Sequence, residues 1–387
     1  MIYLDNAATT FPKPPEVLTR MLEAYQRMGV SPNRGGYDLA VEAGFLVEET
    51  RRKLAKFFGA PDPDRIIFGA NATDALNVAI QGIVRPGDHV VSTRLEHNSV
   101  LRPLFHLREQ IGIEFDLVPF DQNGLIDPDG IGRAIRSDTK LVIVCHASNV
   151  LGTIQPASDI GRICAKRGVP LLLDVAQSAG LVPIDMQAWG VSAVAFTGHK
   201  ALMGPSGIGG LALLEGLEIR PTKFGGTGIE SSSLFHNQAY PDRLEAGTLN
   251  LLGVIGLSAG LDYLAKTGMN HTLEREIDLL ERLSQGLRAI DRVTLYPSAP
   301  RQQRTPVLMC NIDGMRPEDV GAILDADFGI SVRSGLHCAP LLHEDLGTSP
   351  LGGVRFSLGP FNTAEEIDAV VEAMSTISRD PMGRRCD

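Results

Sequence analysis

The feature that most constrains the fold is a regular alternation of short apolar runs and helical stretches in the first half of the chain. Apolar runs occur at Ile66–Gly69, His89–Thr93, Leu141–Cys145 and Ala193–Phe196. Segments with helical spacing of apolar residues lie between them, for example Ala157–Arg167. This alternation is typical of βαβ units, which build a mainly parallel sheet covered by helices on both faces. The sequence therefore predicts an α/β fold.

The length and the later pattern predict a second, smaller domain. A chain of 387 residues can form two hydrophobic cores. Glycine-rich loops follow the alternating region, and a long helix is predicted at Leu251–Lys266, with α+β elements beyond it that include a strand at Ile330–Arg333. We predict a large domain at 15–257 and a small domain formed by 1–14 and 258–387. The net charge of -10 argues against a nucleic-acid or membrane-surface partner, because both bind basic patches.

The cysteines predict a protein of a reducing compartment. Their number is odd, they are widely scattered, and none has the spacing of a disulfide framework or a zinc site: Cys145, Cys164, Cys310, Cys338 and Cys386. The opening MIYLDNAATT has no charged and apolar regions of a secretory signal, and no apolar run approaches the length of a bilayer span. We expect a cytoplasmic protein with no metal site and no membrane partner.

Two polar segments follow buried strands and carry complementary chemistry. The run Ala193–Phe196 leads into TGHK (197–200) and a loop rich in glycine and proline, and Leu171–Leu173 delivers Asp174. Ligands of open α/β sheets bind beyond the carboxyl ends of the strands. There a lysine can hold an aldehyde as a Schiff base and an acid can keep a pyridine nitrogen protonated, as pyridoxal phosphate (PLP) requires. Alone, Lys200 could equally be a solvated loop lysine; its pairing with Asp174 favours the cofactor.

At these residues the chain resembles a known family. The segments LLLDVAQSAG (171–180) and FTGHKALMGPSGIGG (196–210) are similar to those of the class V aminotransferases, which are fold-type I PLP enzymes. Within that family they resemble the cysteine desulfurases, especially the group that includes selenocysteine lyase. The resemblance extends from YLDNAATT (3–10) to the last predicted helix at Ala364–Ser378. It implies a mainly parallel sheet of the seven-stranded type, PLP as the cofactor, and a homodimer.

The resemblance also implies a role for each cofactor contact. Lys200 would carry the cofactor and exchange a proton with the substrate, and Asp174 would face the ring nitrogen. Gln177 would tune the phenolic oxygen, and His97 would stack on the ring and shuttle protons. Taken singly, a histidine is more often structural, and a small-residue helix start is more often only a cap. The phosphate contacts implied by the family are Ala72, Thr73, Thr197, His199 and, across the dimer, Thr248 of the partner subunit.

A second motif indicates the reaction. RSGLHCA (333–339) resembles the RxGHHCA motif of the desulfurase group, in which the cysteine attacks the substrate sulfur; here Leu336 replaces the first histidine. Cys338 is therefore the expected nucleophile. GGVRFS (352–357) is similar to the family segment whose arginine clamps the substrate carboxylate, for which a planar bidentate donor is suited. The implied substrate contacts are Arg355, Asn149 and Arg333, and the resemblance also places Asn149 near the phenolic oxygen of the cofactor.

The implied activity is conversion of L-cysteine to L-alanine, with a persulfide left on Cys338 for a sulfur-acceptor protein. L-Selenocysteine is an alternative substrate, and a transaminase or epimerase of the same fold is an alternative enzyme. A non-catalytic sulfur-transfer scaffold is the alternative from another class, and the presence of Lys200, Asp174 and His97 argues against it. Some relatives carry a histidine where this chain has Gly36 and Tyr37, which weakens any role for Arg34.

Overall fold

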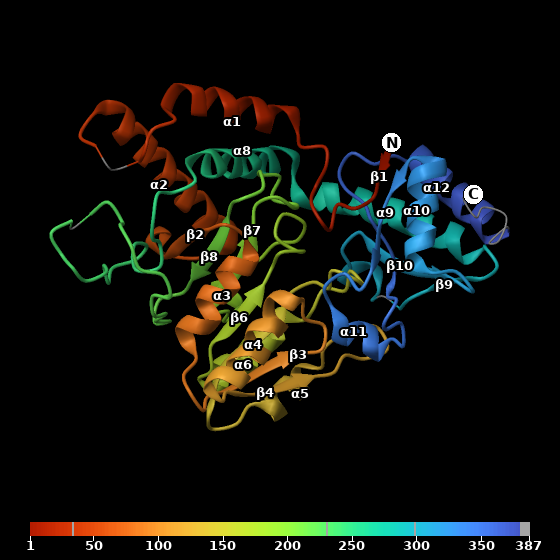
Figure 1. Cartoon of the computed structure of the whole chain (residues 1–387), viewed down its shortest axis with the longest axis horizontal. Helices are drawn as coiled ribbons and strands as arrows, with labels where there is room; N and C mark the ends of the chain where they lie inside the picture. Colours follow the sequence, from red (N-terminus) through yellow and green to blue (C-terminus); the bar gives the residue numbers. More distant parts are fainter. Residues whose placement is uncertain (33–34, 230, 298, 380–387) are drawn as a thin grey trace.

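The computed structural model describes residues 1–32, 35–229, 231–297 and 299–379. Arg34 and Cys386, both considered above, lie outside the described residues. Figure 1 shows a large central sheet flanked by helices and, beside it, a smaller sheet with its own helices. The first residues of the chain lie with the smaller sheet, while α1 packs along α8 over the larger part.

The large sheet has seven strands in the order β2-β8-β7-β6-β5-β3-β4. β3 to β7 pair in parallel and only β8 is antiparallel to its neighbours, so the predicted α/β fold with a mainly parallel sheet is confirmed. The strands are β2 (Ile66–Gly69), β3 (His89–Thr93), β4 (Glu114–Val118), β5 (Thr139–Cys145), β6 (Leu171–Asp174), β7 (Ala193–Thr197) and β8 (Gly209–Leu213).

The strand β8 corrects the expectation that the glycine-rich segment up to residue 210 is only a loop. β8 lies between β2 and β7, and its first residues are Gly209 and Gly210. A Cβ on Gly210 would lie 1.9 Å from the carbonyl oxygen of Ile67, and one on Gly209 would lie 2.5 Å from that of Phe196. Glycine is therefore required where three backbones come close together, although its frequency in the sequence suggests a loop.

Helices cover both faces of the large sheet and bury one hydrophobic cluster on each side. The helix α4 was not predicted, although its buried residues Val100, Leu104 and Leu107 follow a helical spacing. The helices of this part are α1 (Pro15–Met28), α2 (Asp38–Phe58), α3 (Ala72–Ile83), α4 (Asn98–Ile111), α5 (Pro128–Ala134), α6 (Ala157–Arg167), α7 (Met186–Trp189) and α8 (Leu251–Thr267), with a short 3₁₀ turn at Pro63–Arg65.

The smaller sheet is antiparallel, in the order β12-β13-β10-β9, and has a separate hydrophobic cluster that includes Leu4. Its strands are β9 (Val293–Leu295), β10 (Val307–Ile312), β12 (Arg333–Gly335) and β13 (Gly353–Ser357). The accompanying helices are α9 (Met269–Arg288), α10 (Pro317–Phe328), α11 (Pro340–Asp345) and α12 (Ala364–Arg379), with a 3₁₀ turn at Arg301–Gln303.

The single strand expected at Ile330–Arg333 is wrong, because the structure divides this segment between two sheets. β11 (Ile330–Ser331) pairs in parallel with β1 (Ile2–Tyr3), whereas β12 pairs with β13. The N-terminal segment also contacts the smaller part directly, because Leu4 packs in its hydrophobic cluster and Asp5 forms a bridge with Ser357 of β13. The division into domains stays a prediction. Within the described ranges, none of the helices is both long and apolar enough to cross a membrane.

Candidate active site

Most of the predicted site residues meet at one cavity. The cavity has a volume of about 320 Å³ and lies beyond the carboxyl ends of β5, β6 and β7, where ligands of α/β sheets bind. Residues from the N-terminal segment and the smaller sheet close its other side. The predicted residues that line it are Ala72, Thr73, His97, Asn149, Asp174, Gln177, Thr197, His199, Lys200, Arg333 and Arg355.

Asp174 and Lys200 lie at the ends of adjacent, paired strands. Asp174 is buried, and its Oδ1 accepts a hydrogen bond from the backbone N–H of Ala176 at 2.9 Å. Burial raises the pKa of Asp174, while the Ala176 bond and the nearby Lys200 oppose that shift. Burial lowers the pKa of Lys200 to about 8, partly offset by Asp174 and reinforced by two arginines. Lys200 can thus supply the neutral amine that carbonyl chemistry needs.

Unpaired polar atoms at the cavity fit a phosphate. Thr197 Oγ1 and His199 Nδ1 are buried and have no hydrogen-bond partner among the described residues. Buried polar groups normally have a partner, so these two atoms indicate a missing ligand. The first turn of α3 faces the same cavity through Ala72 and Thr73, and the free N–H groups of a helix N-terminus favour anions. This donor set fits the phosphate of PLP, and Asp174 and Lys200 fit its ring nitrogen and aldehyde.

His97 is fixed by hydrogen bonds that determine its protonation. Its Nδ1 accepts from the backbone N–H of Ser99 at 3.0 Å, so that nitrogen carries no proton. Burial, with Lys200 as the next cause, lowers the pKa of His97 to about 4, so the neutral ring carries its proton on Nε2. Ser99 Oγ also lies 2.8 Å from Thr73 Oγ1. The sequence analysis did not identify Ser99. The available signal was its position two residues after His97, where its backbone N–H can bond to a histidine that caps the helix.

Arg355 is a buried side chain that lines the cavity. It is 1% exposed and donates to Asp5 Oδ1 at 2.6 Å and to the carbonyl oxygen of Asn149 at 3.0 Å. Its Nε has no partner among the described residues. Arg333 is its cross-strand neighbour on β12, so two guanidinium groups face the cavity near Lys200. Asp5 was missed, because no local pattern links residues at opposite ends of the chain.

Among the cysteines that the structure describes, Cys338 has the most accessible thiol. Cys145, Cys164 and Cys310 are buried, whereas Cys338 is partly exposed. Its Sγ accepts from an Arg333 N–H at 3.5 Å, and a cation in this position stabilises negative charge on sulfur. Cys338 lines a second, more open cavity of about 610 Å³ that shares the residues Thr73, His97 and Ser99 with the first.

The backbone at Cys338 is strained. His337 and Cys338 have φ values of 49° and 60°, in the left-handed region that disfavours residues with a side chain. That conformation costs roughly 1–2 kcal/mol for each residue. Two hydrogen bonds hold the backbone there: Asn149 Nδ2 donates to the carbonyl oxygen of His337, and the N–H of Asn98 donates to that of Cys338, both at 2.7 Å. Asn149 thus contacts the loop that carries Cys338, a contact that its sequence position does not reveal.

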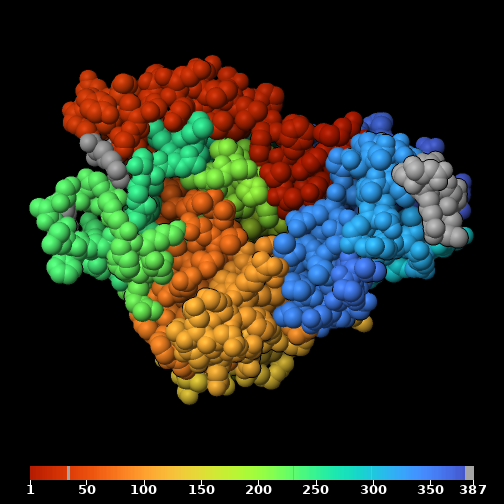
Figure 2. Space-filling model, viewed as in Figure 1, coloured from red at the N-terminus to blue at the C-terminus, as the bar shows by residue number. Residues whose placement is uncertain are grey.

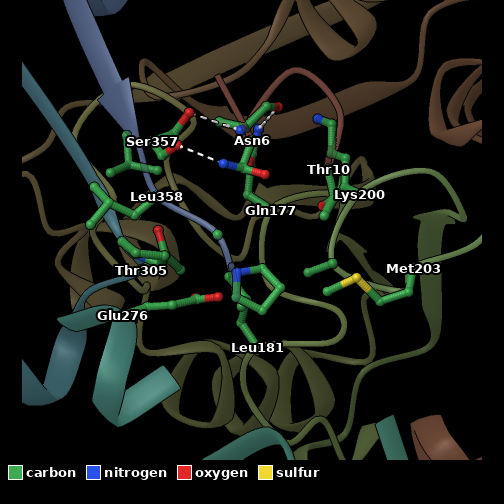
Figure 3. Close-up of a pocket in the computed structure, with 17 residues that line it drawn as sticks. Asn6, Thr10, Gln177, Leu181, Lys200, Met203, Glu276, Thr305, Ser357 and Leu358 are labelled. Carbon is green, nitrogen blue, oxygen red and sulfur yellow. Dashed lines mark hydrogen bonds between the residues drawn. The ribbon is translucent and has the colours of Figure 1, made fainter. Parts of the chain in front are cut away.

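A small cavity lies behind Lys200 and Gln177. Figure 3 shows Asn6, Gln177 and Ser357 on one side of it and Glu276 on another. Its volume is about 30 Å³, and neither carboxyl oxygen of Glu276 has a partner among the described residues. Burial raises the pKa of Glu276 to about 8, so the group is largely protonated near neutral pH. Sequence reasoning did not identify it.

Thr248 lies apart from the cavity of its own chain. It is exposed, and the preceding Gly247 donates its backbone N–H to the carbonyl oxygen of Gly226 at 2.9 Å, in the green segment at the left of Figures 1 and 2. The side chains of Leu234 and Phe235 in this segment are 98% and 88% exposed. Large apolar side chains in such positions are typical of an interaction surface.

Comparisons with known proteins agree with this geometry. The family model of aminotransferase class-V matches residues 2–370. A probable cysteine desulfurase of Methanothermobacter thermautotrophicus is 37% identical, with 97% of this chain and 94% of that protein covered. A cysteine desulfurase of Shigella sonnei is 32% identical, with 98% and 94% covered.

A solved structure supports the same relationship. The apo cysteine desulfurase from Thermococcus onnurineus NA1 superposes with a TM-score of 0.91 and 35% identity, covering 98% of this chain and 94% of that one. The match includes both sheets and the segments that line the cavity, because it extends over nearly the whole chain. The chain therefore belongs to the class V aminotransferase family, among relatives that are named cysteine desulfurases.

Proposed function

We propose that this protein is a PLP-dependent cysteine desulfurase, which converts L-cysteine to L-alanine and keeps the sulfur as a persulfide on Cys338. The observation that carries the proposal is the arrangement of two cavities that share a wall. One contains Asp174 and Lys200, and the other contains the accessible thiol of Cys338, with His97 lining both. The names of the relatives support the same activity.

When bound, PLP supplies an aldehyde that bonds to amines and a ring that accepts electrons. Asp174 would pair with the ring nitrogen, and Lys200 would carry the aldehyde until an amino acid replaces it. His97 would stack on the ring and Gln177 would contact the phenolic oxygen. The N-terminus of α3, with Ala72 and Thr73, would hold the phosphate together with the two unpaired atoms of Thr197 and His199.

The substrate carboxylate would bind at the arginine-lined end of the cavity. Arg355 is already oriented by Asp5 and by the backbone of Asn149, so little side-chain entropy is lost on binding. Arg333 adds a second positive charge on the neighbouring strand. Lys200, with its pKa lowered to about 8, would then take up the substrate α-proton as a general base.

Sulfur transfer would follow at Cys338. The thiolate of Cys338, next to the Arg333 guanidinium, attacks the substrate sulfur. The new S–S bond forms as the Cβ–S bond breaks, the electron pair left on Cβ takes up a proton, and the α-proton held by Lys200 returns to Cα, which completes alanine. The two sulfur atoms are oxidised to a persulfide and the β-carbon is reduced, so no further oxidant or reductant is needed at this step.

The unit of function would be a homodimer. Thr248 of the partner subunit would complete each phosphate site, and the exposed Leu234 and Phe235 would be covered by the second copy. The persulfide would pass to a sulfur-acceptor protein. The free cysteines fit a reducing, cytoplasmic location.

The test is product analysis with purified holoenzyme, L-cysteine and a reductant. Equal amounts of alanine and sulfide are expected from the wild type, and Cys338→Ala should release neither while keeping the absorbance of bound PLP. Undiminished turnover in Cys338→Ala would contradict the persulfide mechanism. Formation of an amino acid from added pyruvate would identify a transaminase, and turnover of L-selenocysteine alone would identify a lyase.

A further inference from the structure

The loop that carries Cys338 rests on a buried pair of imidazoles. His337 is 2% exposed, and His343, on α11, is fully buried. Nδ1 of His337 lies 3.4 Å from Nε2 of His343, and Nδ1 of His343 lies 2.7 Å from the hydroxyl of Thr348. At the other end, Nε2 of His337 lies 3.2 Å from the carbonyl oxygen of Arg333. The four residues therefore form one continuous chain of hydrogen bonds.

The hydrogen bonds of this chain of imidazoles run in one direction, from Thr348 to Arg333. A carbonyl oxygen only accepts, so Nε2 of His337 carries a proton and donates to Arg333. Burial lowers the pKa of His337 well below its usual range and that of His343 to about 4, so each ring is neutral near pH 7 and carries one proton. Nδ1 of His337 then accepts from Nε2 of His343, and Nδ1 of His343 accepts from the hydroxyl of Thr348 at 2.7 Å; the carbonyl oxygen of His343, at 3.3 Å from the same hydroxyl, is a second and more distant acceptor.

This chain supports the strained part of the nucleophile loop. His337 and Cys338 are both held with positive φ, and their carbonyl oxygens are fixed by Asn149 and Asn98. Those two bonds hold only the backbone. The imidazole chain fixes the side chain of His337 and ties it to the backbone of Arg333, whose guanidinium contacts Cys338 Sγ. His337 therefore positions both residues of the Arg333–Cys338 contact: it is bonded to the backbone of Arg333 and directly precedes Cys338.

We propose that His343 and Thr348 are positioning residues that act through His337 to hold Cys338 against the Arg333 guanidinium. Neither residue is among those that line the cavities of the site. They would set the rate at which Cys338 attacks sulfur while leaving cofactor and substrate binding unchanged. The proposal rests on the proposed function, because that reaction makes Cys338 the nucleophile.

The test compares Thr348→Val with Thr348→Ser in the holoenzyme. Valine has nearly the shape of threonine but cannot donate to His343, whereas serine keeps the hydroxyl. In Thr348→Val we expect persulfide formation in a single turnover to slow by about 5- to 10-fold, the loss typical of one buried hydrogen bond. The KM for L-cysteine and the absorbance of bound PLP should stay within about twofold of the wild type, and Thr348→Ser should restore the rate.

Alkylation of Cys338 provides a readout that does not depend on desulfurase activity. Iodoacetamide labelling, followed on the Cys338 peptide by mass spectrometry, should slow several-fold in Thr348→Val because the contact with Arg333 is weakened. Labelling of Thr348→Val at or above the wild-type rate would overturn the inference. A higher KM, weaker PLP absorbance and a slower rate together in both Thr348 variants would also overturn it. If the wild type forms no persulfide, the proposed function fails, and the labelling comparison still tests the positioning role.

Discussion

The two halves of the site are built in opposite ways. Asp174 and Lys200 follow buried, paired strands of the large sheet, so regular backbone structure places them. Cys338 follows the short strand β12, in left-handed backbone, and side chains from several segments hold it. The first half has its geometry fixed by the core, and the second has its geometry fixed by individual polar contacts.

This difference determines what a substitution does. At the strand ends, replacing a side chain removes a chemical group while the surrounding backbone stays in place, because β6 and β7 are buried on both faces. In the Cys338 loop, replacing a supporting side chain keeps the nucleophile but alters where it lies. We therefore expect near-complete losses at the strand ends and graded losses around the loop.

The largest effect is expected for Lys200→Ala. Without the amine that we propose carries the aldehyde and moves the proton, turnover should fall by about 100- to 10,000-fold. Labelling of Cys338 by iodoacetamide should stay at the wild-type rate, because the loop is held by other contacts. The exposed Lys140→Ala is the matched control and should keep full activity. Slower labelling in Lys200→Ala would show that the two halves are not independent.

A smaller effect is expected for Arg333→Gln. Loss of the charged donor at 3.5 Å from Cys338 Sγ should slow persulfide formation by about 10-fold, since hydrogen bonds to charged groups are worth about 1.5–3 kcal/mol and this one is long and partly exposed. Arg333→Lys should recover part of the rate. The measurement is single-turnover persulfide formation together with the KM for L-cysteine.

The same variant separates two roles of Arg333. A rise in KM with an unchanged rate of persulfide formation would assign Arg333 to substrate binding, as the family resemblance implies. A slower rate with an unchanged KM would assign it to the thiolate. The structure places its guanidinium both beside the sulfur and at the wall of the substrate cavity, so kinetics must distinguish them.

The sequence predicted the strand-end half of the site better than the loop half, for a physical reason. Asp174 ends one apolar run and Lys200 follows another after a short polar turn, so the local sequence is enough to predict both at one edge of the sheet. The loop of Cys338 is held by groups far away in sequence, such as Asn149, which donates to the carbonyl oxygen of His337, and its backbone is left-handed at residues other than glycine. The Asp5–Arg355 pair likewise joins the two ends of the chain. No local pattern reports such contacts.

The fold shows the same division. Buried strands with ordinary composition were predicted almost residue by residue, as in β2 and β3. β8 was missed because close packing of three strands requires glycine there, and glycine in a sequence usually indicates a loop. The segment from Ile330 to Arg333 was read as one strand because its apolar pattern does not show that its two ends pair with different sheets.

The smallest effect on activity is expected for Glu276→Gln, which probes the region between the two halves. Glu276 comes from α9 of the smaller part and faces the small cavity behind Lys200. Because burial raises its pKa in the folded protein to about 8, from an ordinary value of 4.5, the folded state binds more protons than the unfolded state between these values. The stability that Glu276 contributes is therefore present below about pH 4.5 and is lost as the pH rises to 8 and above.

Glutamine keeps the shape of the side chain and cannot ionise, so the variant should not lose that stability. The free energy of unfolding of Glu276→Gln minus that of the wild type should therefore increase from pH 5 to pH 8, by an amount on the order of 1 kcal/mol or more. Denaturant unfolding at each pH measures this difference, and turnover should stay within about twofold of the wild type because the residue lies outside the reaction cavity.

Glu274→Gln, on the exposed face of the same helix, is the matched control, and its difference in unfolding free energy from the wild type should not change with pH. A flat difference for Glu276→Gln as well would mean that its carboxyl group meets water or a cation in the small cavity, and that the boundary between the two halves is more polar than its lining side chains indicate.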